Sequence, residues 1–213
     1  MDTIARILGK YKPGIDSFLD LGCGDVFLGY FLHELFPDAH GVFVDISSEM
    51  IEKAGRKSPD PAYEFIVKDF GKSNWYKSIR SAEKFDLVIS GYAIHHLENM
   101  DKSRLYRDIF RLLNPESFFL NLEHVLSPTR ELEDLFNDLV EDGMYAYQKH
   151  IGDEKTREEI KKVYFDPNHK ILNKLESVET QCSWLREIVF SEADCYMKIF
   201  ELALFGGMKR IES

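Results

Sequence analysis

Apolar runs alternate with segments of helical periodicity along the first part of this chain. The five apolar runs of strand length are Ile15–Asp20, His40–Asp45, Tyr63–Val67, Phe85–Ser90 and Phe118–Glu123. Between the first two, Leu28, Phe31, Leu32 and Leu35 recur at the spacing of a helix with one buried face. Strands that alternate with helices pack as a parallel sheet with right-handed crossovers. The pattern therefore predicts an α/β fold.

The alternation stops after the fifth run. Residues 127–176 hold helical patterns and no convincing strand, and a last helix follows from Ser177. Two closing strands, Cys195–Phe200 and Leu202–Phe205, indicate an antiparallel pair. We predict one domain over residues 1–213, with a doubly wound, mostly parallel seven-stranded sheet, a C-terminal antiparallel hairpin and a helical insertion over residues 127–176 after strand five.

The insertion leaves the carboxyl end of a strand, the edge where open α/β sheets bind ligands. Segments of this length that interrupt a compact domain commonly carry function. We therefore expect a lid over the substrate. A plain connecting helix with a long loop remains the alternative.

A glycine-rich turn follows the first predicted strand. Asp20 ends the apolar run, Gly22 and Gly24 come next, and Asp45 closes the second run about twenty residues later. Glycines let the backbone turn sharply and approach a ligand closely. A following helix directs free N–H groups at that ligand. This order predicts a site for a cofactor that contains adenosine.

Two common cofactor classes fit this turn poorly. A dinucleotide fingerprint requires a third glycine, where this chain has Phe27. A phosphate-binding P-loop requires Gly-Lys-Ser/Thr, and that tripeptide does not occur near the turn.

The remaining pattern resembles motif I of the class I S-adenosylmethionine-dependent methyltransferases. Asp20, Gly22 and Gly24 match that motif, and Asp45–Met50 is similar to the second motif of the family. Many members carry another glycine where this chain has Val26. The resemblance implies a Rossmann-like fold and a methyl transfer from S-adenosylmethionine to a small molecule, with S-adenosylhomocysteine as the product.

The resemblance also implies roles for individual residues. Asp20 would hold the methionine end of the cofactor, Asp45 the ribose hydroxyls, and Asp69 the adenine amino group, with Phe70 covering the ring. The full predicted cofactor-binding set is Asp20, Gly22, Cys23, Gly24, Asp45, Ile46, Met50, Asp69, Phe70 and Ser90.

Histidines follow the fourth and fifth strands. His95, His96 and His124 are the candidate catalytic residues, because imidazole suits proton removal near neutral pH. Methyl transfer from a sulfonium can also proceed through alignment and desolvation alone. We favour alignment, with His95 as the first candidate for a base.

Charge and cysteine content limit the partners, metal sites and cellular compartments that fit this chain. The chain has 37 acidic and 27 basic residues and a net charge of −10, which argues against nucleic acid as a partner. Three cysteines without metal-type spacing favour a cytoplasmic protein without a metal site. No apolar run is long enough to span a membrane, and the N-terminus lacks the pattern of a signal peptide. An RNA-modifying methyltransferase and a non-catalytic cofactor-binding protein remain the alternatives.

Overall fold

The computed structural model describes residues 1–12, 14–58, 60–79, 84–153, 155–164 and 172–210. The strands are β1 (Ser17–Leu21), β2 (His40–Asp45), β3 (Glu64–Val67), β4 (Phe85–Gly91), β5 (Leu113–His124), β6 (Ser191–Ile199) and β7 (Leu202–Lys209). The helices are α1 (Asp2–Tyr11), α2 (Phe27–Leu35), α3 (Ser48–Lys57), α4 (Asn99–Leu112), α5 (Arg130–His150), α6 (Arg157–Tyr164) and α8 (Val178–Glu187), with short 3₁₀ helices at Trp75–Ser78 and Ile94–His96.

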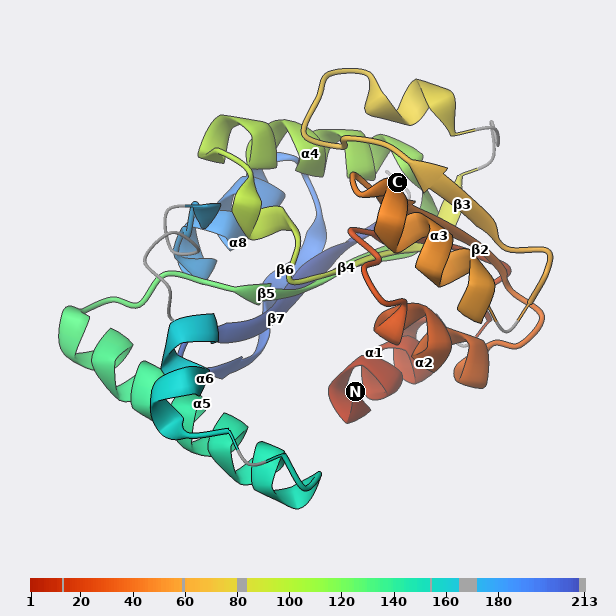
Figure 1. The fold of residues 1–213 in the computed structure, drawn as a ribbon. Helices are drawn as coiled ribbons and strands as arrows, with labels where there is room; N and C mark the ends of the chain where they lie inside the picture. Colours follow the sequence, from red (N-terminus) through yellow and green to blue (C-terminus); the bar gives the residue numbers. More distant parts are fainter. Residues whose placement is uncertain (13, 59, 80–83, 154, 165–171, 211–213) are drawn as a thin grey trace.

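The strands form one seven-stranded sheet in the order β3-β2-β1-β4-β5-β7-β6 (Figure 1). The first five strands pair in parallel, whereas β7 runs antiparallel between β5 and β6. The strand order reverses between β1 and β4, because β2 and β3 follow on one side of this pair and β5 on the other. In open α/β sheets, ligands bind in the crevice at the carboxyl ends of the strands at such a point. The predicted fold class is confirmed.

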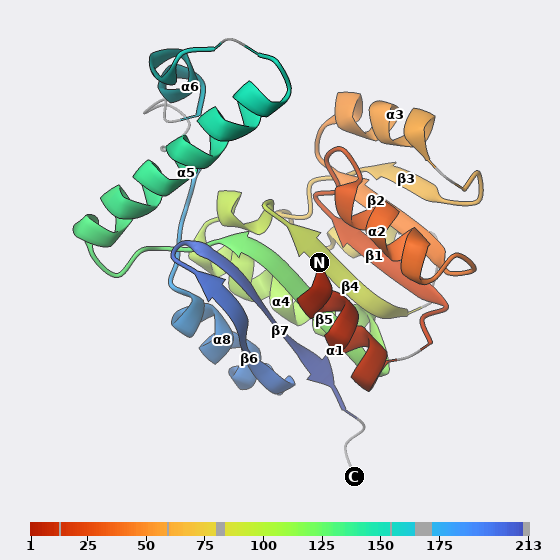
Figure 2. The same cartoon turned by 90° about the horizontal axis from the view of Figure 1, so that it is seen from below.

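Helices cover both faces of the sheet and bury two separate apolar cores (Figure 2). On one face, α1, α2 and α3 contribute side chains such as Leu8 and Leu32, which pack with Phe18 and Phe43 of the sheet. On the other face, α4 and α8 bury residues such as Tyr106 against the opposite side of the strands. Strands buried on both faces require the continuous apolar runs seen in the sequence.

The last three strands are longer than the sequence pattern predicts, and β6 begins at Ser191, upstream of the predicted Cys195. β5 begins at Leu113, upstream of the predicted Phe118, because Leu113 pairs with Phe85 of β4 and Ser117 pairs with Lys209 of β7. β7 extends to Lys209, whereas the pattern stops at Phe205. Pairing with β5 sets the length of β7. The sequence pattern of its later residues, Gly206, Gly207 and Met208, does not by itself predict a strand.

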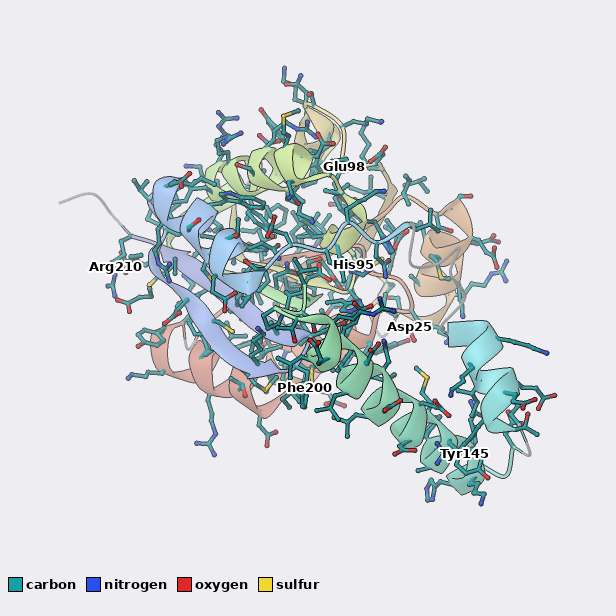
Figure 3. The ribbon with its side chains drawn as sticks, turned by 90° about the vertical axis from the view of Figure 1, so that its left-hand side faces the viewer. Asp25, His95, Glu98, Tyr145, Phe200 and Arg210 are labelled. Carbon is teal, nitrogen blue, oxygen red and sulfur yellow. The ribbon has the colours of Figure 1, made fainter. Side chains whose placement is uncertain are left out.

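The insertion projects from the body of the molecule as two helices that pack on each other (Figure 2). Glu141 of α5 pairs with Arg157 and Lys161 of α6 at 3.3 and 3.0 Å. Figure 3 shows Phe200 near the start of α5 and Tyr145 towards its far end. No helix among the described residues is both long and apolar enough to cross a bilayer.

We predict that Gly206→Ala destabilises the fold. A Cβ at this position would lie 2.0 Å from the carbonyl oxygen of Phe119 on the paired strand. Overpacking of this kind costs about 1–3 kcal/mol. Gly143→Ala on α5 is the matched control, because a Cβ there meets nothing within 4 Å. Urea unfolding of both variants measures the difference, and equal midpoints would contradict the strand packing described here.

Candidate active site

The loop after β1 takes the conformation for which its glycines are needed. Gly22 and Gly24 have φ angles of +72° and +49°, which side-chain-bearing residues rarely adopt. A Cβ on Gly22 would lie 2.1 Å from Cβ of Ala93, so the loops after β1 and β4 meet at this glycine. Val26, where many family members carry glycine, also has a positive φ of 62°. A β-branched residue is strained there.

Asp45 ties the glycine loop to the end of β2. Its Oδ2 accepts the backbone N–H of Gly24 at 3.0 Å, and its Oδ1 accepts that of Ser47 at 2.9 Å. Each carboxylate oxygen keeps a further lone pair. Asp45 therefore braces the loop and can still accept two hydroxyl donors.

Asp20 is the least satisfied polar group in this region. It is only 1% exposed, and both carboxyl oxygens lack a hydrogen-bond partner among the described residues. Burial, together with the nearby Asp45 carboxylate, raises the pKa of Asp20 to about 7. A buried carboxylate without a partner is costly, and a cationic group brought by a ligand would offset that cost.

A cavity of about 320 Å³ opens beside Asp20. We call it the glycine-loop cavity; its lining residues are Asp20, Gly22, Cys23, Gly24, Asp25, Phe27, Leu28, Gly91, Tyr92 and Leu122. Burial and the neighbouring acids raise the pKa of Cys23, so its thiol is inert in this loop. Sequence reasoning missed Tyr92, whose φ of 51° turns it out of the end of β4.

The other predicted cofactor residues divide between core and surface. Phe70 is buried against Trp75 and lies near Gly22, whereas Asp69 accepts the N–H of Gly71 at 2.9 Å, as a turn-forming Asp does. None of the five remaining predicted residues lines the glycine-loop cavity, and Asp45 contacts the loop from outside its lining. Ser90 is buried and donates its hydroxyl to the carbonyl of Leu21, while Ile46 and Met50 are exposed at the start of α3.

The candidate histidines lie together, and two of them are paired with carboxylates. Nδ1 of His95 lies 2.6 Å from Oε1 of Glu123, and Nε2 of His124 lies 2.6 Å from Oε2 of Glu201. The ring centroids of His95 and His124 are 5.9 Å apart. Burial and the adjacent His95 lower the pKa of His96, which keeps its ring neutral at pH 7. Glu201 lies in the β6–β7 turn, and no sequence signal links it to His124.

A second cavity of about 390 Å³ lies where the insertion joins the sheet. We call it the neck cavity; its lining residues are His124, Leu126, Ser127, Glu133, Asn137, Asn173, Lys174, Leu175 and Glu201. Leu122 lines the first cavity and His124 the second, two positions apart on the same strand. Alternate residues of a strand share a face, so the two cavities are neighbours along β5.

Comparison with known proteins decides the family. A family model described as a methyltransferase domain matches residues 15–195. The chain belongs to this methyltransferase family. The match begins just before β1 and runs into β6, so it includes the glycine loop, the three histidines and the insertion.

Curated relatives match only part of the chain. A protein named malonyl-[acyl-carrier protein] O-methyltransferase from Anoxybacillus flavithermus is 34% identical over 74 residues, which are 35% of this chain and 26% of that protein. A similarly named protein from Ilyobacter polytropus is 30% identical over 99 residues, 46% of this chain and 34% of that protein. The chain thus matches about a quarter to a third of the length of these relatives.

Solved structures share the fold at low sequence identity. An O-methyltransferase family protein from Burkholderia thailandensis superposes with a TM-score of 0.67 at 12% identity, covering 98% of this chain and 56% of that chain. Human N-acetylserotonin methyltransferase in complex with SAM superposes with a TM-score of 0.57 at 18% identity, covering 92% of this chain and 48% of that chain. The methyltransferase fold is therefore established, and the acceptor of this chain is not.

The Asp20 carboxyl predicts a pH-dependent affinity for S-adenosylhomocysteine. With a pKa of about 7 in the free protein, Asp20 must lose its proton before it can pair with the ligand's ammonium group. Affinity should rise about tenfold from pH 6 to pH 8 and then level off. Calorimetric titration across this range measures the change, and Asp20→Asn should bind with a flat profile. An affinity of the native protein that is independent of pH would contradict this role.

Proposed function

We propose that this chain transfers a methyl group from S-adenosylmethionine to a polar small molecule. The observation that carries the proposal is the buried, unpartnered carboxyl of Asp20 on the wall of the glycine-loop cavity. The family membership and the braced glycine loop support it. The acidic net charge of −10 argues against an RNA acceptor.

The residues at this cavity fit S-adenosylmethionine. Asp20 offers a carboxylate to the ammonium group of the methionine portion, and Asp45 keeps lone pairs for ribose hydroxyls. The glycines at Gly22 and Gly24 allow the backbone to approach without a Cβ between. Position 27 carries Phe27, which is 59% exposed, where a dinucleotide site requires a closely packed glycine.

When bound, S-adenosylmethionine supplies a methyl group that is already activated as a sulfonium. The protein then has to align the acceptor and exclude water. His95 lies beside this region and is held by Glu123, which accepts from Nδ1 and leaves Nε2 able to take a proton. Since His95 is only 7% exposed, positioning of the loop after β4 is its main role.

We also propose that the insertion acts as a lid. Its two ends are joined where Leu126 donates its N–H to the carbonyl of Glu176 at 3.1 Å. The returning segment contacts the histidine loop, because Lys174 donates its N–H to the carbonyl of His95 at 2.7 Å. Buried Lys102 also donates to the carbonyl of Lys174. Movement of the helices would therefore be coupled to the loop that holds His95.

The cofactor assignment predicts selective binding. S-adenosylmethionine and S-adenosylhomocysteine should bind in calorimetric titrations, and NAD should not. Asp45→Ala should weaken the binding of S-adenosylhomocysteine about tenfold or more, because two hydroxyls lose an acceptor at roughly 1–3 kcal/mol and the loop loses its brace. Asp38→Ala, at an exposed position before β2, is the control and should bind normally.

Two outcomes would contradict this assignment. Preferential binding of NAD would overturn the cofactor class. Unchanged affinity in a folded Asp45→Ala variant would remove Asp45 from the site. The thermal midpoint of each variant, measured in parallel, separates lost binding from lost folding.

The lid proposal predicts ligand-dependent protection of α5. Leu132, Leu135 and Leu139 are exposed along one side of this helix. Closure over bound S-adenosylhomocysteine would bury apolar surface and slow amide exchange in Arg130–His150 by about tenfold. Helix α8 is the internal control, because its buried face packs in the core beneath the sheet. Equal exchange of α5 with and without the ligand would mean that the insertion is a fixed connection.

A further inference from the structure

Tyr92 has an uncommon backbone conformation just after the end of β4. Its φ of 51° lies in the left-handed region, which a bulky aromatic residue rarely adopts. Its N–H donates to the carbonyl of Leu122 on β5 at 2.8 Å, and the next residue, Ala93, lies against Gly22 of the glycine loop. These two contacts hold the strained residue between β5 and the glycine loop.

The side chain of Tyr92 is not part of either apolar core. Tyr92 lines the glycine-loop cavity together with Asp20 and Gly22, and it is 47% exposed. The fold therefore gains little from burying this ring. Strained residues persist where their surroundings over-determine them, and they cluster at ligand sites. A bound ligand is thus the partner that the ring of Tyr92 fits best.

The sulfur of S-adenosylmethionine joins its methionine portion to its ribose. Under the proposed function, Asp20 receives the ammonium group of the methionine portion and Asp45 receives the ribose hydroxyls. The sulfur would therefore lie between these two carboxylates. This is the part of the cavity wall that Gly22, Gly91 and Tyr92 line.

The phenol of Tyr92 is neutral at neutral pH. Burial and the nearby Glu123 carboxylate raise the pKa of Tyr92 above the ordinary value of a tyrosine, so no phenolate forms. A neutral aromatic ring still attracts a cation over its face through its quadrupole. The sulfonium of S-adenosylmethionine carries a positive charge, whereas the thioether sulfur of S-adenosylhomocysteine carries none. A ring beside the sulfur therefore acts differently on the two molecules.

We propose that Tyr92 is a specificity-determining residue whose ring favours the sulfonium of S-adenosylmethionine over the neutral sulfur of S-adenosylhomocysteine. This inference rests on the proposed function. Both ligands share the ammonium group and the ribose, so Asp20 and Asp45 hold these parts of each in the same way. The ring adds a contact that the product loses together with its charge, which eases the exchange of product for fresh cofactor.

Calorimetric titrations with S-adenosylmethionine, S-adenosylhomocysteine and sinefungin test the role of the ring. Sinefungin carries a protonated amine in place of the methyl sulfonium. Tyr92→Leu removes the ring and keeps apolar bulk, so it should lower the affinity for S-adenosylmethionine and sinefungin about five- to thirtyfold. Its affinity for S-adenosylhomocysteine should change less than twofold. Tyr92→Phe keeps the ring and should keep the native ratio of affinities within twofold.

Thermal unfolding of the free protein tests whether the conformation of Tyr92 is kept for the ligand. Asparagine tolerates the left-handed region better than tyrosine does. Tyr92→Asn should therefore raise the thermal midpoint by about 2–4 °C, while it weakens S-adenosylmethionine binding as Tyr92→Leu does. Val189→Asn is the matched control, because Val189 has a φ of 72°, is 63% exposed and lies between α8 and β6. It should raise the midpoint similarly and bind all three ligands as the native protein does.

The outcomes separate this inference from the proposed function. A native protein that binds neither S-adenosylmethionine nor S-adenosylhomocysteine overturns the proposed function itself. If the native protein binds both, equal losses for the two ligands in Tyr92→Leu, or no loss for either, overturn the role of the ring. A lowered midpoint of Tyr92→Asn beside a raised midpoint of Val189→Asn would mean that the fold requires the ring, and would overturn its assignment to the ligand.

Discussion

The buried carboxyl of Asp20 is the constraint on which the rest of the site depends. It lies one residue before the end of β1 inside the sheet, where both oxygens lack partners among the described residues and its pKa is raised to about 7 by burial and the nearby Asp45 carboxylate. Buried carboxyls without partners are costly, and groups with such raised pKa values cluster at functional sites. The residues around it form the glycine-loop cavity. Gly22 and Gly24, in left-handed conformations, add no side chains to it, and Asp45 holds the loop that forms its wall.

The same edge of the sheet carries a second polar system. On β5, Leu122 borders the glycine-loop cavity, Glu123 points to the other face and holds His95, and His124 borders the neck cavity. Three successive residues of one strand thus border the glycine-loop cavity, the loop that carries His95 and the neck cavity. This arrangement follows from strand geometry, in which neighbouring side chains point to opposite faces.

The sequence predicted the parts of this structure that depend on local patterns. The five parallel strands, the start of the last helix after Ser177 and the order of Asp20, the glycines and Asp45 all have short-range signals. Contacts between residues that lie far apart in the sequence were not predicted. Glu201 reaches His124 from 77 residues away, and the length of β7 is set by β5, so neither has a signal of its own. Ser90 is predicted at the cofactor site, and no sequence signal indicates that its hydroxyl donates to the carbonyl of Leu21 within the sheet.

We propose that Asp20 and Asp45 together hold S-adenosylmethionine at the glycine loop. A crystal structure with S-adenosylhomocysteine tests this most directly. We expect the ligand's ammonium group within hydrogen-bond distance of Asp20 and the ribose hydroxyls on Asp45. A ligand bound at another edge of the sheet, or one that leaves the Asp20 carboxyl without a partner, would contradict it.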